Sequence, residues 1–149
     1  MVDREKLRGK ISFIEKNLGI LTRLAQIPVE EFTQESTNFH AAIRLLQVSI
    51  EAMIDIGNHI VARERLGIPK TYGEVFGLLA EAAIIPQDFA AMARVMVRFR
   101  NRVVHLYADT DEKQVYHILQ ENLRDFSSFI GFIVQRYLAE NNDDHQGCR

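Results

Sequence analysis

The sequence predicts an all-α protein, an up-and-down bundle of four long helices with one short accessory helix. Two observations support this prediction. Apolar residues recur at alternating spacings of three and four along four long segments, which is the pattern of an amphipathic helix. Only 8 glycines and 3 prolines occur among 149 residues, and the segments between them are rich in residues of high helix propensity. With 47% hydrophobic residues, the chain can fill one core, so we expect one domain over 1–140 and a disordered polar tail over 141–149.

The first two helices are predicted from their apolar stripes. The first stripe ends before Pro28 and comprises Leu7, Ile11, Ile14, Leu18, Leu21 and Ala25. The second stripe is longer, runs from Phe39 to Ile60, and is followed by the stop signals Gly67 and Pro69. We expect this second helix to be the central one.

The remaining helices follow from capping signals and further stripes. Thr71 and Glu74 have the spacing of a capping box, and a short third helix should follow them to about residue 85. Pro86 suits the first turn of a fourth helix whose stripe runs from Phe89 to Leu106. The last predicted helix is one segment, with a stripe from 116 to 137 and either Asp109 or Thr110 as its cap. Four helices with such apolar stripes pack most readily as an up-and-down bundle.

Composition excludes several classes of protein. A formal net charge of −2 gives no general attraction for nucleic acid, so any RNA contact must be local. The single cysteine, Cys148, excludes an internal disulfide and a cysteine zinc site and favours a reducing compartment. No signal peptide and no segment long enough to cross a membrane is recognisable, so we expect a cytoplasmic protein.

The residues that could take part in a reaction lie in one segment. The chain has no glycine-rich phosphate loop, H-E-x-x-H, paired CxxC or G-x-S-x-G motif, which removes the commonest nucleotide-hydrolysing, zinc and serine-hydrolase classes. Residues 94–107 read RVMVRFRNRVVHLY and place four arginines before one histidine: Arg94, Arg98, Arg100, Arg102 and His105.

This cluster meets the needs of RNA cleavage. Guanidinium groups bind phosphate, and an imidazole both accepts and donates protons near neutral pH. When a 2′-hydroxyl attacks the neighbouring phosphodiester, these two functions suffice, with no metal and no cofactor. The competing interpretation is structural, since a row of arginines is commonly a solvated helix flank and a lone histidine commonly has a structural role.

The segment 100–107, RNRVVHLY, resembles the R-N-x-x-x-H-x-Y signature of the HEPN superfamily, in particular of the HepT toxins. The resemblance extends to Asp55–Ile60 in the second predicted helix and to Tyr72–Phe76 at the start of the third, and it covers nearly the whole chain except the polar tail. The domain over 1–140 is therefore expected to be HEPN-like.

The resemblance implies a metal-independent endoribonuclease toxin that acts on RNA as a homodimer, with tRNA a plausible substrate. It also implies neutralisation by a minimal nucleotidyltransferase antitoxin. Carried over to this chain, Arg100 and His105 are the catalytic pair, and Asn101 is the polar support of the motif. Tyr107 is the residue to which the antitoxin attaches AMP.

Helix geometry raises a question about this pair. At about 100° per residue, Arg100 and His105 are about 140° apart, on opposite flanks of the apolar stripe of their helix. Either the helix distorts before His105, or a two-fold axis joins the motifs of two subunits in one composite cleft. We favour the second, which predicts that Tyr107 lies near the arginine at the mouth of the cleft.

Other polar residues receive weaker predictions. Arg98 and Arg102 either bind flanking phosphates or form a solvated flank. Asp55 and Asn58 are candidates for the cleft or the dimer seam, although buried polar packing is the favoured explanation for Asp55 and His59. No role is predicted for three histidines: His40, His117 and His145.

Two other functions compete with the enzyme. The domain could be a non-catalytic helical partner, or nucleotide-binding module, of a minimal nucleotidyltransferase, or it could be a helical scaffold. The intact set of Arg, Asn, His and Tyr favours the enzyme, because neither alternative needs all four together.

Overall fold

The computed structural model describes residues 1–139, so the predicted tail over 141–149 lies outside the described residues. Within the described part, helices follow one another without any β-strand, as the sequence predicted: α1 (Arg4–Ala25), α2 (Val29–Gln34), α3 (Ser36–Arg63), α4 (Tyr72–Glu81), α5 (Gln87–His105), the 3-10 turn η1 (Tyr107–Asp109), α6 (Glu112–Glu121), α7 (Leu123–Ile133) and the π-helical turn η2 (Val134–Leu138).

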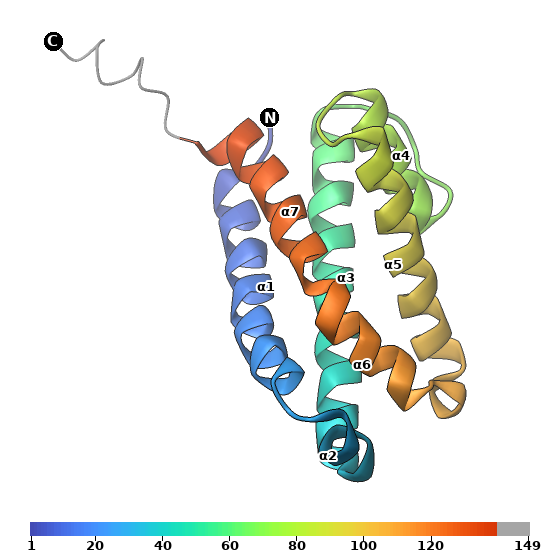
Figure 1. Ribbon diagram of the computed structural model, residues 1–149. Helices are drawn as coiled ribbons and strands as arrows, with labels where there is room; N and C mark the ends of the chain where they lie inside the picture. Colours follow the sequence, from blue (N-terminus) through green and yellow to red (C-terminus); the bar gives the residue numbers. More distant parts are fainter. Residues whose placement is uncertain (140–149) are drawn as a thin grey trace, which may run out of the picture.

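Four columns of helix alternate in direction, as Figure 1 shows: α1, α3, α5, and α6 followed by α7. The long helix α3 is central, since it contacts α1, α2, α4, α5 and α6. The short helix α4 packs on α3 and α5 as the accessory helix. The expected bundle of four long helices is therefore confirmed.

The core is apolar and aromatic. Phe32, Phe76, Phe126 and Phe129 are almost completely buried, and burying one such side chain contributes about 1.5–3 kcal/mol to folding. The rings of Phe76 and Phe129 meet edge to face with centroids 5.9 Å apart, which ties α4 to α7. No helix among residues 1–139 is both long enough and apolar enough to cross a membrane.

One short helix, α2, was not predicted. It follows Pro28 and has one buried side chain, Phe32, whose ring lies 5.2 Å from that of Tyr116 on α6. A six-residue helix with a single buried position has no apolar stripe, so periodicity could not detect it.

The last helix was predicted as one segment, but it is divided at Asn122. The backbone of Asn122 has φ −114° and ψ −2°, and the side-chain amide of this residue donates to the Asp125 carboxylate at 3.0 Å. The N-cap was also placed wrongly: Asp111, whose carboxylate accepts from the Lys113 amide, caps α6 in place of Asp109 or Thr110.

The start of α4 is fixed by two features. The Thr71 hydroxyl accepts from the Glu74 amide at 3.2 Å, as predicted, whereas the Glu74 carboxylate accepts from the Lys70 amide and not from Thr71. On α3, Gly57 allows α4 to approach closely, because a Cβ at this position would lie 2.6 Å from Cγ1 of Val75. The helix ends at Glu81, earlier than the predicted residue 85.

Candidate functional site

Three of the four motif residues, Arg100, Asn101 and His105, lie on the C-terminal half of α5, where that helix extends past the start of α4. On the preceding turns the corresponding face of α5 is buried, with Ala90, Ala93 and Val97 nearly inaccessible. Beyond the first residue of α4 this face opens into a groove of about 790 Å³. The groove is lined by Asn58, Pro69, Lys70, Thr71, Tyr72, Arg100, Asn101, Val104 and His105.

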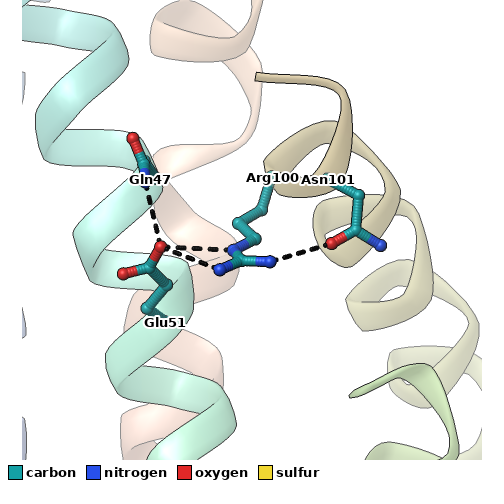
Figure 2. A network of polar contacts seen from close by, with 4 residues as sticks. All are labelled: Gln47, Glu51, Arg100 and Asn101. Carbon is teal, nitrogen blue, oxygen red and sulfur yellow. Dashed lines mark hydrogen bonds and ion pairs between the residues drawn. The ribbon is translucent and has the colours of Figure 1, made fainter. Parts of the chain in front are cut away.

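Arg100 is held by protein contacts on several sides, as Figure 2 shows. Its Nε donates to Oε1 of Glu51 at 3.2 Å, and its Nη2 lies 3.2 Å from the same oxygen. Its Nη1 donates to Oδ1 of Asn101 at 3.1 Å. Glu51 also accepts from the side-chain amide of Gln47 at 3.0 Å, so the arginine on α5 is joined to a short polar network on α3.

An aromatic ring completes the surroundings of this guanidinium. The carbon at its centre lies 5.3 Å from the ring centroid of Tyr72, the first residue of α4, within the range of a cation–π interaction. Only 18% of the Arg100 side chain is exposed. The positive charge therefore occupies a defined position at the wall of the groove.

His105 is the last residue of α5 and is exposed. The helix stays α-helical through this residue, so the distortion considered from the sequence is absent. The shorter arc between Arg100 and His105, about 140°, carries Asn101 and Val104, and all four residues line the same groove. One chain thus brings the predicted catalytic pair to one groove without a second subunit.

Tyr107 lies elsewhere in the chain. It begins η1, is not among the residues that line the groove, and its hydroxyl is hydrogen-bonded to Nδ1 of His40 on α3. Within one chain, Tyr107 therefore does not line the groove that contains Arg100, and its position near the arginine of a two-subunit cleft stays a prediction. No role was predicted for His40, yet it is the residue in contact with the predicted modification site.

The other arginines of the motif region differ in their surroundings. Arg98 is exposed, and Arg102 donates from Nη1 to the side-chain oxygen of Gln114 on α6 at 3.0 Å. Arg94 is half-buried and lies against two glycines of α4, Gly73 and Gly77. Arg94 therefore packs between helices, while Arg98 and Arg102 remain open to solvent.

The polar residues on α3 divide into three environments. Asn58 lines the groove, as the cleft prediction allowed. Asp55 is exposed and pairs with Nζ of Lys10 at 3.0 Å, so the favoured prediction of buried packing is wrong for this residue. That prediction holds for His59, which is buried and accepts from the Asp3 amide at 2.9 Å on Nε2. Burial, followed by the nearby Lys6 charge, lowers the pKa of His59.

Four residues around the site were missed by sequence reasoning: His40, Gln47, Glu51 and Tyr72. A signal for three of them was present. Polar residues recur along α3 at spacings of three and four, on a stripe separate from the apolar one, and this polar stripe comprises His40, Arg44, Gln47, Glu51, Asp55 and Asn58. No group of three or more potential metal ligands among His, Cys, Asp and Glu occurs within residues 1–139.

Comparison with known sequences gives consistent relatives. A model of the family described as Ribonuclease HepT-like matches residues 14–133. A Shewanella oneidensis protein called mRNA nuclease HepT is 39% identical over 103 residues, which make up 69% of this chain and 77% of the relative. An Aphanizomenon flos-aquae protein called tRNA nuclease HepT is 27% identical over 139 residues, 92% of this chain and 95% of the relative.

Solved structures agree with these sequence matches. The fold is similar to a tri-AMPylated Shewanella oneidensis HEPN toxin in complex with MNT antitoxin, with a TM-score of 0.82, 33% identity and coverage of 91% of this chain and 99% of that chain. It is equally similar to a chain in the crystal structure of a toxin–antitoxin with AMP-PNP, with a TM-score of 0.82, 32% identity and coverage of 88% and 98%. The expected HEPN-like bundle is confirmed.

Proposed function

Because this chain belongs to the HepT-like ribonuclease family, we propose that it is an endoribonuclease toxin that cleaves RNA at the groove between α5 and the segment that leads into α4. The observation that carries the proposal is the position of Arg100, Asn101 and His105, which line one groove in one chain. The chemistry requires a cation fixed beside the reacting phosphate and a group that transfers protons, and these residues supply both.

The reaction follows from these groups. The 2′-hydroxyl of a ribose attacks the adjacent phosphorus, and the bond from that phosphorus to the 5′-oxygen of the next nucleotide breaks. His105 accepts the proton of the attacking hydroxyl or donates one to the leaving oxygen, and Arg100 stabilises the negative charge that builds on the phosphate oxygens. Neither role calls for a metal or a cofactor.

The network around Arg100 prepares it for this role. A guanidinium has five N–H donors: the one on Nε donates to Glu51 and one on Nη1 donates to Asn101, while Nη2 lies 3.2 Å from the same Glu51 oxygen. The remaining donors can bind a phosphate while the protein contacts hold the plane of the group. Asn101 and Glu51 are therefore positioning residues, and Arg100 is the residue that touches the substrate.

The groove has the composition of a site for single-stranded RNA. Among the described residues, those that line it include the cations of Lys70 and Arg100 and no carboxylate, although Glu51 pairs with Arg100 beside it and the whole protein is slightly acidic. Tyr72 is 47% exposed and offers an aromatic ring on which a base can stack. Arg98 and Arg102, both exposed on α5, are proposed to bind phosphates that flank the cleaved bond.

The active form is proposed to be a homodimer. Two large apolar side chains next to groove residues in the sequence are exposed, to 54% at Leu106 and 91% at Ile68. A second copy related by a two-fold axis would cover these side chains and place two grooves side by side. The composite cleft predicted from the sequence would then bring Tyr107 of one subunit toward the groove of the other.

We further propose that a minimal nucleotidyltransferase antitoxin silences the toxin by attaching AMP to Tyr107. The side chain is 41% exposed and lies two residues beyond His105, so a transferase can reach it. The added phosphate would place negative charge near the cations that RNA needs. The similar HEPN toxin solved with MNT antitoxin is AMPylated, which supports this proposal.

The experiment that tests the enzyme compares wild-type protein with His105→Ala and His117→Ala in excess EDTA. Because the two named relatives are an mRNA nuclease and a tRNA nuclease, both RNA classes are offered. We expect the wild type and His117→Ala, which changes an exposed histidine on α6, to cleave RNA, and His105→Ala to lose cleavage. Intact RNA with the wild type would favour the non-catalytic partner instead.

A further inference from the structure

The surroundings of Tyr107 contain a candidate proton acceptor for the modification proposed above. Its hydroxyl is hydrogen-bonded to Nδ1 of His40, and the two rings lie parallel, with centroids 5.6 Å apart and an angle of 9° between the planes. The residues are 67 positions apart in the chain, so folding alone brings them together. The imidazole is therefore in direct contact with the atom that would be modified.

Both residues are held by regular backbone. His40 lies in the second turn of α3, which is continuous over 28 residues. Tyr107 begins η1, where its carbonyl accepts from the Thr110 amide at 3.2 Å and the preceding Leu106 amide donates to the Arg102 carbonyl at 2.7 Å. The contact thus joins α3 to the connection between α5 and α6.

The pair is also open to an incoming enzyme. Tyr107 is 41% exposed and His40 is exposed, and neither lines the groove that contains Arg100. A contact between two exposed rings buries little apolar area, so it contributes little to folding free energy. The geometry of the pair therefore calls for an explanation other than packing.

We propose that His40 is the proton acceptor in the adenylylation of Tyr107, an inference that rests on the modification proposed above. The phenolic oxygen attacks the α-phosphorus of ATP, and a bond forms between these atoms. The bond from that phosphorus to the oxygen of the leaving pyrophosphate breaks. The phenolic proton passes to Nδ1 of His40, and the exposed imidazole later releases a proton to water.

This role follows from the chemistry of a phenol. A phenol is a weak acid and a poor nucleophile while it keeps its proton, and general-base catalysis removes the proton as the new bond forms. With its own proton on Nε2, a neutral imidazole presents the lone pair of Nδ1 to the hydroxyl. The observed contact places the acceptor where this transfer requires it.

Other charged groups lie close to the pair in the sequence, and they are the same in every variant of the test. Arg44 lies one turn beyond His40 on α3, and His105 and Asp109 lie two residues to either side of Tyr107. On α2, which packs against α3, the first turn is acidic. A test that changes His40 alone, and compares pH profiles, separates the imidazole from these groups.

The test measures the rate of adenylyl addition to the full-length protein by its cognate nucleotidyltransferase with ATP and Mg²⁺. Mass spectrometry of intact protein gives the rate, and peptide fragmentation identifies the modified residue. The variants are His40→Asn, in which an amide oxygen replaces the Nδ1 acceptor without its basicity, His40→Ala, and His117→Asn as the matched control. Thermal unfolding of each variant verifies that the fold is kept.

We expect both His40 variants to be modified about 100-fold more slowly than the wild type and His117→Asn to be unaffected. The pH profile of the wild-type rate should differ from that of His40→Asn. A His40→Asn rate and pH profile equal to the wild type would overturn the proposal while leaving the modification intact. A wild type that gains no adenylyl group on Tyr107 would overturn the proposed silencing itself, and this inference with it.

Discussion

The carboxylate of Glu51 on α3 and the guanidinium of Arg100 on α5 form an ion pair in which 33% and 18% of the two side chains are exposed. This pair links the central helix of the bundle to the helix that carries the motif. It converts a flexible arginine into a group with a fixed plane, which is what a preorganised site for phosphate requires.

Removing this support should slow catalysis without removing the catalytic pair. Glu51→Ala is expected to lower kcat for RNA cleavage about tenfold, because the guanidinium loses its orientation. Glu51→Gln should retain most of the activity, since its amide oxygen can still accept from Nε of Arg100. Glu15→Ala, which removes an exposed carboxylate on α1, is the control. A Glu51→Ala enzyme with wild-type kcat would show that the ion pair does not position Arg100.

The aromatic ring at the groove should contribute to RNA affinity. In a His105→Ala background that does not cleave, Tyr72→Ala is expected to weaken binding of a single-stranded oligonucleotide about tenfold, and Tyr72→Phe should bind like its parent. Fluorescence anisotropy at fixed salt measures both. Equal affinities for the Ala and Phe variants would mean that no base stacks on this ring.

The close approach of α3 and α4 should appear in stability. Gly57→Ala places a Cβ 2.6 Å from Cγ1 of Val75, which is buried, so we expect a loss of about 1–3 kcal/mol in the free energy of unfolding. Gly19→Ala is the matched control on α1, where nothing lies within 4 Å of the new Cβ, and it should stabilise by about 0.5–1 kcal/mol. Urea denaturation measures both, and a stabilised Gly57→Ala protein would contradict the close contact.

Stability should also fall in mildly acidic solution because of His59. Burial lowers the pKa of this imidazole in the folded protein, so the unfolded chain binds more protons as pH falls through the ordinary histidine range. The free energy of unfolding is therefore expected to decrease from pH 7 to pH 5. Protonation would also abolish the hydrogen bond from the Asp3 amide to Nε2.

His59→Gln provides the comparison for this pH effect. Its side-chain oxygen can accept from the Asp3 amide at every pH, and it has no proton to gain. Thermal unfolding of this variant should depend less on pH between 5 and 7 than that of the wild type. Parallel curves for the two proteins would assign the acid sensitivity to other groups.

Much of the fold could be predicted because long apolar stripes report burial directly. The stripe of α1 is an example: Leu7, Ile14 and Leu21 are all fully buried. The sequence signals for helix breaks and helix caps were weaker. The break at Asn122 left no trace in the stripe, because the apolar spacing continues across it, and Asp111 competed with two other capping residues within three positions.

The site could be predicted in part. Arg100, Asn101 and His105 were named from their resemblance to the HEPN signature, and all three line one groove. The contacts of Arg100 with Glu51 and Tyr72 could not be, because they depend on how α3 and α4 pack against α5. The position of Tyr107 within the chain could not be predicted either, because α5 ends at His105 and Tyr107 begins the turn η1.

Because α3 is one continuous helix, it fixes the separation between two contacts of the site. His40, which touches Tyr107, and Glu51, which holds Arg100, belong to the same rigid rod and are separated by eleven positions, or about 16 Å along its axis. Thermal motion of loops cannot change that spacing. AMP attached to Tyr107, as proposed, would therefore have to span this separation, or belong to a neighbouring copy, to obstruct the groove at Arg100.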